Sequence, residues 1–133
     1  MKQQNETKTI LLVDDDDIFL TIMEVMLENV YKTIKTRSGK EALDYLCKGN
    51  TPHLILLDIV MPEMDGWETF NKLRGISLLK NVPIAFMTIL DKTDAVKHAN
   101  ELGAADYIKK PCEREDLLNR IEAILSKNYA PDA

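Results

Sequence analysis

Acidic residues stand directly after two aliphatic runs of this sequence. Asp14 and Asp15 follow TILLV, residues 9–13, and Asp58 ends HLILLD, residues 53–58. Carboxylates at the edge of a core are costly to desolvate, and close neighbours repel each other unless a cation joins them or one takes up a proton. Oxygen ligands without His or Cys suit a hard ion such as Mg²⁺, or Mn²⁺ in its place. The first expectation is therefore a divalent-cation site.

A hydroxyl and a cation follow two further apolar segments. Thr88 ends VPIAFMT, residues 82–88, and Lys110 ends ADYIKK, residues 105–110. A lysine opposite the acids can pair with Asp58 or with an anion bound to it, and a threonine hydroxyl can donate to that anion. A carboxylate nucleophile, a metal and two donors for the equatorial oxygens together suit phosphoryl transfer to a carboxylate.

These residues need a scaffold that brings distant segments together. Apolar runs and helical spacing predict strands alternating with helices. The expected strands are 9–13, 31–37, 53–58, 82–88 and 105–110, and the expected helices are 17–29, 39–49, 67–74, 91–103 and 113–127. Strict alternation indicates an α/β fold, with a parallel sheet covered by helices on both faces and ligands bound beyond the carboxyl ends of the strands. The polar second strand suits a sheet edge.

Helix ends are predicted from capping residues. Asp17 is expected to cap the helix over 17–29, with Asp16 in the loop before it. Gly49 and Gly103 are expected to end the second and fourth helices. The helix over 17–29 itself rests on residues at helical spacing, namely Ile18, Ile22, Val25, Met26 and Asn29.

Length and composition restrict the class of protein. A chain of 133 residues suits one domain, expected over 9–127 between a flexible N-terminus, 1–8, and a tail, 128–133. A net charge of −5 argues against a nucleic-acid surface. No apolar run is long enough for a bilayer and no signal-peptide core is present, which predicts a cytoplasmic protein without membrane contact. Cys47 and Cys112 lack metal-ligand spacing and are expected to be reduced thiols.

Four ring-bearing residues are expected to have structural roles only. His53 and His98 are predicted to be solvated, without a part in proton transfer. Trp67 and Phe70 are predicted to pack their helix on the sheet.

Four motifs occur together in a characteristic order. They are LLVDDD, LILLDIVMPEMDGWE, IAFMT and GAADYIKKP. With them the chain resembles, over residues 8–127, a response-regulator receiver domain, the CheY-like module of two-component signalling. The resemblance implies a flavodoxin-like (βα)5 three-layer sandwich with strand order 2-1-3-4-5, the order that CheY itself has.

The resemblance also implies a role for each acidic residue. Asp58 would be the phosphoacceptor. Asp14 and Asp15 would form the acidic pair, with Asp15 the more direct Mg²⁺ ligand and Asp14 acting largely through water. Asp58 and the backbone carbonyl of Val60 would complete the protein's share of the metal ligands.

Further roles are implied for residues near the ends of the last two strands. Thr88 and Lys110 would hold the phosphoryl oxygens. Tyr107 would be an aromatic switch that turns inward when Thr88 moves. The peptide bond between Lys110 and Pro111 would be cis, an isomer that is cheap only before proline.

The implied function is a phosphorylation-activated switch rather than an enzyme with an external substrate, catalysing only its own phosphoryl transfer and dephosphorylation. A sensor histidine kinase or a phosphotransfer protein would be the donor. The face formed by 91–103, 105–110 and 113–127 would then change shape for a downstream protein or for a second copy in a homodimer. Opposite charges that could cross such an interface are Lys97, Asp106, Glu115 and Arg120, although an ordinary solvated face is the favoured interpretation of these four.

The sequence departs from the family pattern at several positions. Ile89 follows Thr88 where a small residue is usual, and it should narrow access to a phosphate. Val60 and Leu90 are apolar and cannot orient an attacking water, so slow self-hydrolysis is expected. Cys112 stands after Lys-Pro, where an aromatic residue is frequent.

Two other classes share parts of these motifs. VDDDDIF also reads as the Asp-x-Asp motif of a haloacid dehalogenase-type Mg²⁺-dependent phosphatase, with Asp14 as nucleophile and Asp16 as acid. No second acidic pair follows the lysine, which argues against that reading. A flavodoxin-like electron carrier would need a flavin-phosphate loop rich in Ser, Thr and Gly in place of the acids.

Overall fold

Five parallel strands form a single sheet in the computed structural model, which describes residues 7–127. The strands lie in the order β2-β1-β3-β4-β5. Their bounds are β1 (Thr9–Val13), β2 (Lys32–Thr36), β3 (Leu54–Leu57), β4 (Ile84–Thr88) and β5 (Tyr107–Lys109). The predicted α/β class and strand order are therefore confirmed, and β2 occupies the expected edge.

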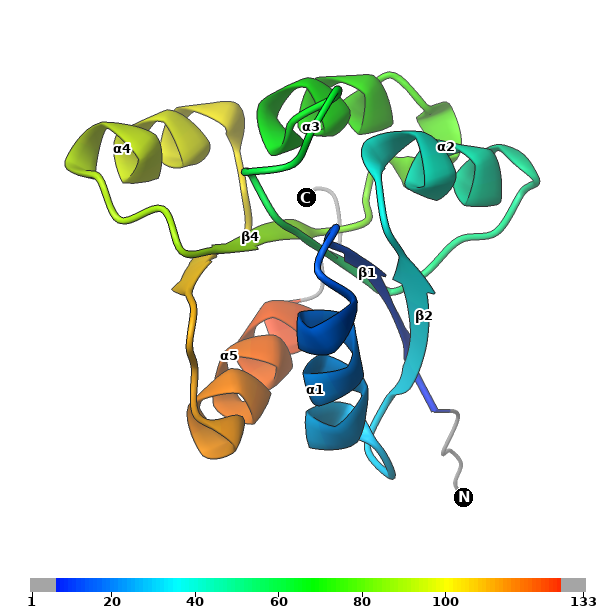
Figure 1. Ribbon diagram of the computed structural model, residues 1–133. Coiled ribbons are helices and arrows are strands. Elements are labelled where there is room, and N and C mark those ends of the chain that lie inside the picture. The colour runs from blue at the N-terminus through cyan, green and yellow to red at the C-terminus, as the bar shows by residue number, and fades with distance from the viewer. Residues whose placement is uncertain (1–6, 128–133) are drawn as a thin grey trace.

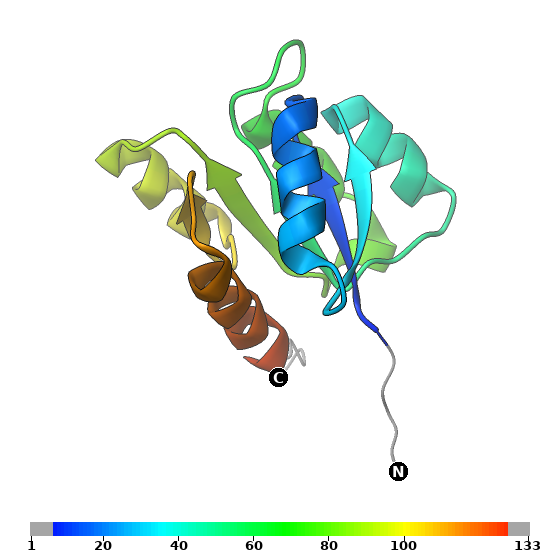
Figure 2. The same cartoon turned by 60° about the horizontal axis from the view of Figure 1, so that its bottom comes forward.

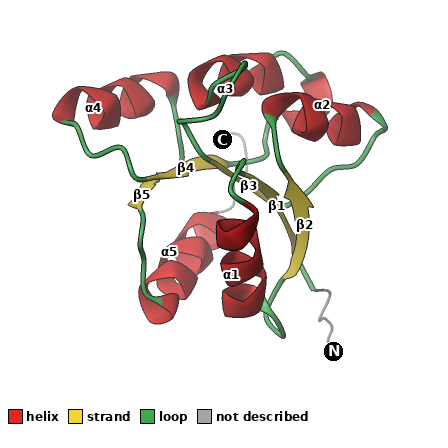
Figure 3. Cartoon of the chain, in the orientation of Figure 1, coloured by secondary structure: helices red, strands yellow, loops and turns green. Residues whose placement is uncertain are grey.

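Helices cover both faces of this sheet. Their bounds are α1 (Asp17–Leu27), α2 (Gly39–Cys47), α3 (Gly66–Arg74), α4 (Thr93–Leu102) and α5 (Arg114–Lys127). α1 and α5 lie on one face and α2, α3 and α4 on the other, so the predicted three-layer sandwich is confirmed (Figure 1). The strands form a single layer between these helices (Figure 3). None of the helices within residues 7–127 is long and apolar enough to cross a bilayer.

The register aligns the carboxyl ends of the strands. Val13 pairs with Thr36 on one side and with Leu57 on the other, and Leu57 pairs in turn with Phe86. The arrows of β1, β2 and β4 point toward the same edge in Figure 2. Residues that directly follow the strands are thus gathered at one edge of the sheet.

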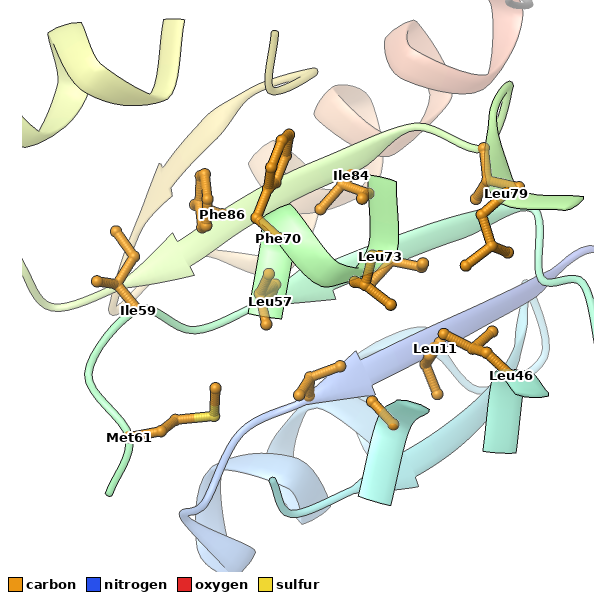
Figure 4. Packing of buried hydrophobic residues seen from close by; sticks show 14 of the residues in the cluster. Leu11, Leu46, Leu57, Ile59, Met61, Phe70, Leu73, Leu79, Ile84 and Phe86 are labelled. Carbon is orange, nitrogen blue, oxygen red and sulfur yellow. The ribbon is translucent and has the colours of Figure 1, made fainter. Parts of the chain in front are cut away.

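Each face of the sheet buries its own apolar layer. Leu11 and Val13 of β1 pack toward α2 and α3, whereas Ile10 and Leu12 pack toward α1 and α5. Phe70 lies over the sheet on the first of these faces (Figure 4). Burial on both faces explains why β1, β3 and β4 read as unbroken aliphatic runs.

The start and end of α1 differ from the prediction. The N-cap is Asp16 rather than Asp17, and its carboxylate accepts from the backbone N–H groups of Ile18 and Phe19 at 3.0 and 3.3 Å. The helix ends at Leu27 rather than at residue 29, and Asn29 has a φ of 69°. A run of four aspartates offers several candidate caps, and local backbone geometry decides among them.

Most of the residues whose spacing predicted α1 do not lie on the side that packs on the sheet. Leu20, Met23 and Leu27 are buried, in agreement with helical spacing. Three of the residues at the spacing used for the prediction are exposed, by 74% for Ile18, 47% for Ile22 and 56% for Val25, whereas Met26 is half-buried against the core. The helix is apolar on two sides, and periodicity alone could not tell which side faces the core.

Other boundaries differ by one or two residues. Gly49 and Gly103 follow α2 and α4 with positive φ values of 94° and 88°, which confirms the predicted helix stops. A short 3-10 helix over Ser77–Leu79 was not predicted. The predicted flexible ends lie mostly outside the described residues, at 1–6 and 128–133.

Candidate functional site

Carboxylates from two segments meet at the carboxyl edge of the sheet. Asp14 directly follows β1 and Asp58 directly follows β3, and the Asp58 N–H donates to the Val13 carbonyl at 2.9 Å. Asp14 and Asp58 are only 4% and 5% exposed, whereas Asp15 is exposed. One oxygen from each of these three residues lies within 4.8 Å of the others. The predicted acidic cluster is thus present.

The backbone after Asp58 fixes the orientation of its side chain. Asp58 Oδ1 accepts from the Ile59 N–H at 2.7 Å and from the Val60 N–H at 3.4 Å. The Gly66 N–H donates to the Ile59 carbonyl at 2.8 Å, and a Cβ at Gly66 would overlap the Asp58 carbonyl oxygen. Only glycine therefore allows the start of α3 to approach Asp58 this closely. Oδ1 is held by the chain, while Oδ2 faces the cluster.

A lysine ammonium joins the two buried carboxylates. Lys110 Nζ donates to Asp14 Oδ2 at 2.6 Å and to Asp58 Oδ2 at 3.2 Å, and the lysine side chain is 11% exposed. The Lys110 N–H donates to the Thr88 carbonyl at 3.0 Å, which ties the residue to the end of β4. The Lys110–Pro111 peptide bond is cis, as predicted.

The cluster carries more negative charge than its lysine offsets. Burial raises the pKa of Asp14 and the nearby Asp58 raises it further, while hydrogen bonds from Lys110 and from the Asp16 N–H lower it. The net shift is upward, so ionisation of Asp14 is disfavoured in the folded state. Three carboxylates with an excess of negative charge fit a hard divalent cation such as Mg²⁺ or Mn²⁺.

Thr88 and Tyr107 are connected through one residue of the loop after β4. Thr88 is fully buried, and its Oγ1 accepts from the Leu90 N–H at 3.2 Å. The Tyr107 hydroxyl donates to the Leu90 carbonyl at 2.6 Å. Burial, followed by the charges of Asp91 and Asp58, raises the pKa of Tyr107, so its hydroxyl stays protonated as a donor. A movement of Leu90 would disturb both side chains.

Two apolar residues lie exposed on the loops around the cluster. Val60 is 52% exposed and Ile89 is 69% exposed. Val60 touches the cluster through its backbone N–H, while its side chain offers no polar group. Ile89 projects largely into solvent, so the departure from a small residue places a large apolar group at the surface rather than in the core.

Asp16 does not belong to the carboxylate cluster. Its carboxylate is used as the α1 cap, and the cluster within residues 7–127 consists of Asp14, Asp15 and Asp58. The phosphatase interpretation needs Asp16 as an acid beside Asp14. An exposed carboxylate bound to helix N–H groups is poorly placed for that role, so the geometry disfavours this alternative.

Phe19 is part of the site although the sequence did not indicate it. Its ring centroid lies 4.1 Å from Lys110 Nζ. The residue belongs to the first turn of α1, next to the acidic run. An aromatic residue one turn after the acids was the available signal, but its contact with a lysine 91 positions later depends on how α1 is rotated against the sheet.

Two of the four charges that could cross a dimer interface, Asp106 and Arg120, pair within the chain. Arg120 Nη1 donates to Asp106 Oδ2 at 2.9 Å, and Arg120 Nε donates to Asp116 Oδ2 at 3.1 Å. Both contacts raise the pKa of Arg120 further. Lys97 and Glu115 are exposed.

The thiols and rings outside the site have local partners. Cys47 and Cys112 are free, as predicted, and burial together with a hydrogen bond to Asp116 raises the pKa of Cys112 to about 11. His53 is exposed, and its Nδ1 also accepts from the Thr9 N–H at 2.9 Å.

The aromatic residues of α3 pack as predicted. The Trp67 ring lies 4.9 Å from the Phe86 ring of β4 and 4.5 Å from the exposed His98 of α4. Phe70 stacks on Phe86 at 5.4 Å. Trp67 and Phe70 therefore join α3 to the sheet.

Comparisons with a family profile, with related sequences and with solved structures all lead to the same protein family. The profile of the response regulator receiver domain matches residues 10–122. The polar-differentiation response regulator DivK of Brucella ovis is 32% identical over 120 residues, which cover 90% of this chain and 97% of DivK. The signal receiver domain of a signal transduction histidine kinase from Syntrophus aciditrophicus has a TM-score of 0.82 and 33% identity, with 96% of each chain covered.

A further relative is much longer than this chain. A Vibrio cholerae protein named "Probable cyclic di-GMP phosphodiesterase" is 36% identical over 124 residues, and the chain spans 28% of its length. The family match is thus to one domain that also occurs within larger proteins. Strand order, clustered carboxylates and these similarities agree, and the chain belongs to the response-regulator receiver family of two-component signalling.

Proposed function

We propose that this chain is a phosphorylation-activated switch that accepts a phosphoryl group on Asp58 with the help of Mg²⁺ or Mn²⁺. The donor is a sensor histidine kinase or a phosphotransfer protein, and the switch operates in the cytoplasm. The observation that carries the proposal is the Lys110 ammonium, which bridges Asp14 and Asp58 at the mouth of a three-carboxylate cluster. In this proposal the chain catalyses only its own phosphorylation and dephosphorylation.

The proposed roles follow from which oxygens are already engaged. Asp14, Asp15, Asp58 and the Val60 carbonyl would hold the metal, which when bound supplies positive charge to the oxygens of the transferring group. Asp58 Oδ1 is held by two backbone N–H groups, which leaves Oδ2 as the attacking atom. Lys110 Nζ already donates to Oδ2 and would donate to the phosphoryl oxygens once they carry the negative charge.

The switch itself would run through Leu90. The phosphoryl group adds negative charge and strong acceptor oxygens near Thr88. If the Thr88 side chain rotates about its Cα–Cβ bond to donate to such an oxygen, Oγ1 moves away from the Leu90 N–H. Leu90 is then free to move, and its carbonyl, which accepts from the Tyr107 hydroxyl, would move that side chain too. The face of α4, β5 and α5 then changes for a downstream protein or a second copy. Because Asp106 and Arg120 pair within the chain, a homodimer would have to use other groups of this face or break that pair.

Treatment with acetyl phosphate in Mg²⁺ tests the proposal. We expect intact-mass spectrometry to show one adduct of about 80 Da, the mass of an added phosphoryl group. The adduct should be absent from Asp58→Asn and retained in Asp16→Asn, which serves as the matched acidic control. Label mapped to Asp14, or lost in Asp16→Asn, would instead favour the phosphatase reading.

A further inference from the structure

The ammonium of Lys110 lies over the face of an aromatic ring. Nζ is 4.1 Å from the Phe19 ring centroid, well within the roughly 6 Å over which a cation is attracted by a ring face. Phe19 is half-buried and belongs to α1, whereas the carboxylate partners of Lys110 follow β1 and β3. The neighbours of the ammonium thus come from three segments of the chain, namely α1 and the loops after β1 and β3.

The hydrogen-bonding capacity of the ammonium explains why a third partner matters. A lysine ammonium carries three N–H donors. Asp14 Oδ2 and Asp58 Oδ2 accept from Nζ at 2.6 and 3.2 Å, which leaves one donor for another direction. The lysine side chain is only 11% exposed, so little water can reach it, and the Phe19 ring is a further neighbour of the ammonium. Cation–π attraction is stronger where water is excluded.

The structure also fixes where the ring lies. The Asp16 carboxylate accepts from the Phe19 N–H at 3.3 Å, which sets the first turn of α1. Phe19 lines a small cavity that also touches Asp14, Asp58 and Leu20. The ring therefore has a defined position between the helix cap and the buried carboxylates.

We propose that Phe19 is a positioning residue that holds the Lys110 ammonium in place for the phosphoryl group. The inference rests on the proposed function, because it assumes phosphoryl acceptance at Asp58. A ring face attracts the ammonium without adding a formal negative charge, which would repel the incoming group. It also restricts the rotamers of a long side chain before binding, so less entropy is lost when the phosphoryl oxygens engage Lys110.

The Phe19 ring also packs against the core layer beneath α1, so a test must separate this packing from its attraction for the ammonium. Site-specific incorporation of mono-, di- and trifluorophenylalanine at position 19 keeps the shape of the ring and withdraws its π-electron density. We expect the affinity for beryllofluoride in Mg²⁺ to fall with each added fluorine, by roughly 2- to 13-fold in total, the ratio that corresponds to ordering one long side chain on binding. Mg²⁺ affinity alone should stay near the wild-type value.

Phe70 provides the matched control. It is a buried phenylalanine that also faces a cation, with Arg74 Cζ 5.2 Å from its ring centroid, but it lies in the core layer on the other face of the sheet. The same fluorinated series at Phe70 should leave beryllofluoride affinity unchanged.

A second readout does not depend on ligand binding. In NMR spectra of the metal-free protein, the ε-methylene protons of Lys110 should be shifted upfield by the ring. That shift should disappear in Phe19→Leu and return in Phe19→Tyr. An absent shift in the unmodified protein, or a flat fluorination series at position 19, would overturn the inference. Failure of the unmodified chain to take up acetyl phosphate on Asp58 would instead overturn the proposed function, so the two failures are distinguishable.

Discussion

At the scale of single residues, the site combines groups whose ionised forms are mutually unfavourable. Asp14 and Asp58 are both buried, and the Lys110 ammonium forms an ion pair with each of them. The carboxylates and Lys110, which the structure brings together, were predictable because each follows an apolar run. The role of Thr88 at the site stays a prediction. Sequence analysis could not find the Phe19 contact or the use of Leu90 as a link, since both depend on side-chain directions that periodicity does not specify.

The raised pKa of Asp14 leads to a pH-dependent stability. An acid whose pKa is higher in the folded than in the unfolded state favours folding while it is protonated, and this contribution is lost as pH rises from the ordinary value of 3.8 through the raised one. Asp14→Asn should therefore be more stable than the wild type at pH 7 without divalent cations, with the advantage shrinking toward pH 4. Urea unfolding in EDTA at both pH values measures this.

Asp15→Asn is the control for this experiment, because Asp15 is an exposed member of the same cluster. Its effect on the free energy of unfolding should be smaller than that of Asp14→Asn. A destabilised Asp14→Asn protein at pH 7 would show that the hydrogen bond from Lys110 outweighs the cost of burial.

Val60 and Leu90 determine a second expectation at this scale. Neither side chain can hydrogen-bond a water in line with the phosphoryl group, and Val60 is 52% exposed at the site. The phosphorylated form should therefore lose its label slowly, and Val60→Gln should lose it faster. Release of phosphate from purified phosphoprotein in Mg²⁺ measures both rates, and wild-type decay within seconds would contradict the expectation.

At the scale of elements, the aliphatic runs of β1, β3 and β4 predicted the sheet well, because strands buried on both faces need apolar residues at every position. Helix α1 shows where that reasoning fails. Its exposed side carries Ile18, Ile22 and Val25, so hydropathy along the helix does not distinguish the core side from the solvent side. Its cap could not be chosen within a run of four aspartates.

The cap of α1 gives a prediction for this element. Asp16→Ala removes the acceptor for the Ile18 and Phe19 N–H groups and should cost about 1 kcal/mol of stability. Asp17→Ala is the neighbouring control, since the Asp17 carboxylate forms an exposed ion pair with Arg37, a type of contact worth about 0–1 kcal/mol. Chemical denaturation of both variants measures the difference. A larger loss in Asp17→Ala would contradict the assignment of the cap.

At the scale of the whole molecule, the sheet collects the ends of β1, β3, β4 and β5 at one edge, so a ligand there should stabilise the folded state as a unit. Mg²⁺ at tenfold its dissociation constant should add about 1.4 kcal/mol to the free energy of unfolding if it binds only the folded chain. Thermal unfolding at increasing Mg²⁺ concentration measures this. Asp58→Asn should respond less, and an equal response in both would place the ion elsewhere.

One aromatic contact described above has a practical consequence. Trp67 is the single tryptophan of the chain, and it touches Phe86 of the central sheet and His98 on the outer surface of α4. Its fluorescence therefore comes from one known place, where the third and fourth helices meet. Any rearrangement of that junction on phosphorylation would alter the emission, and rapid-mixing fluorescence would then follow the proposed switch in real time without an attached dye.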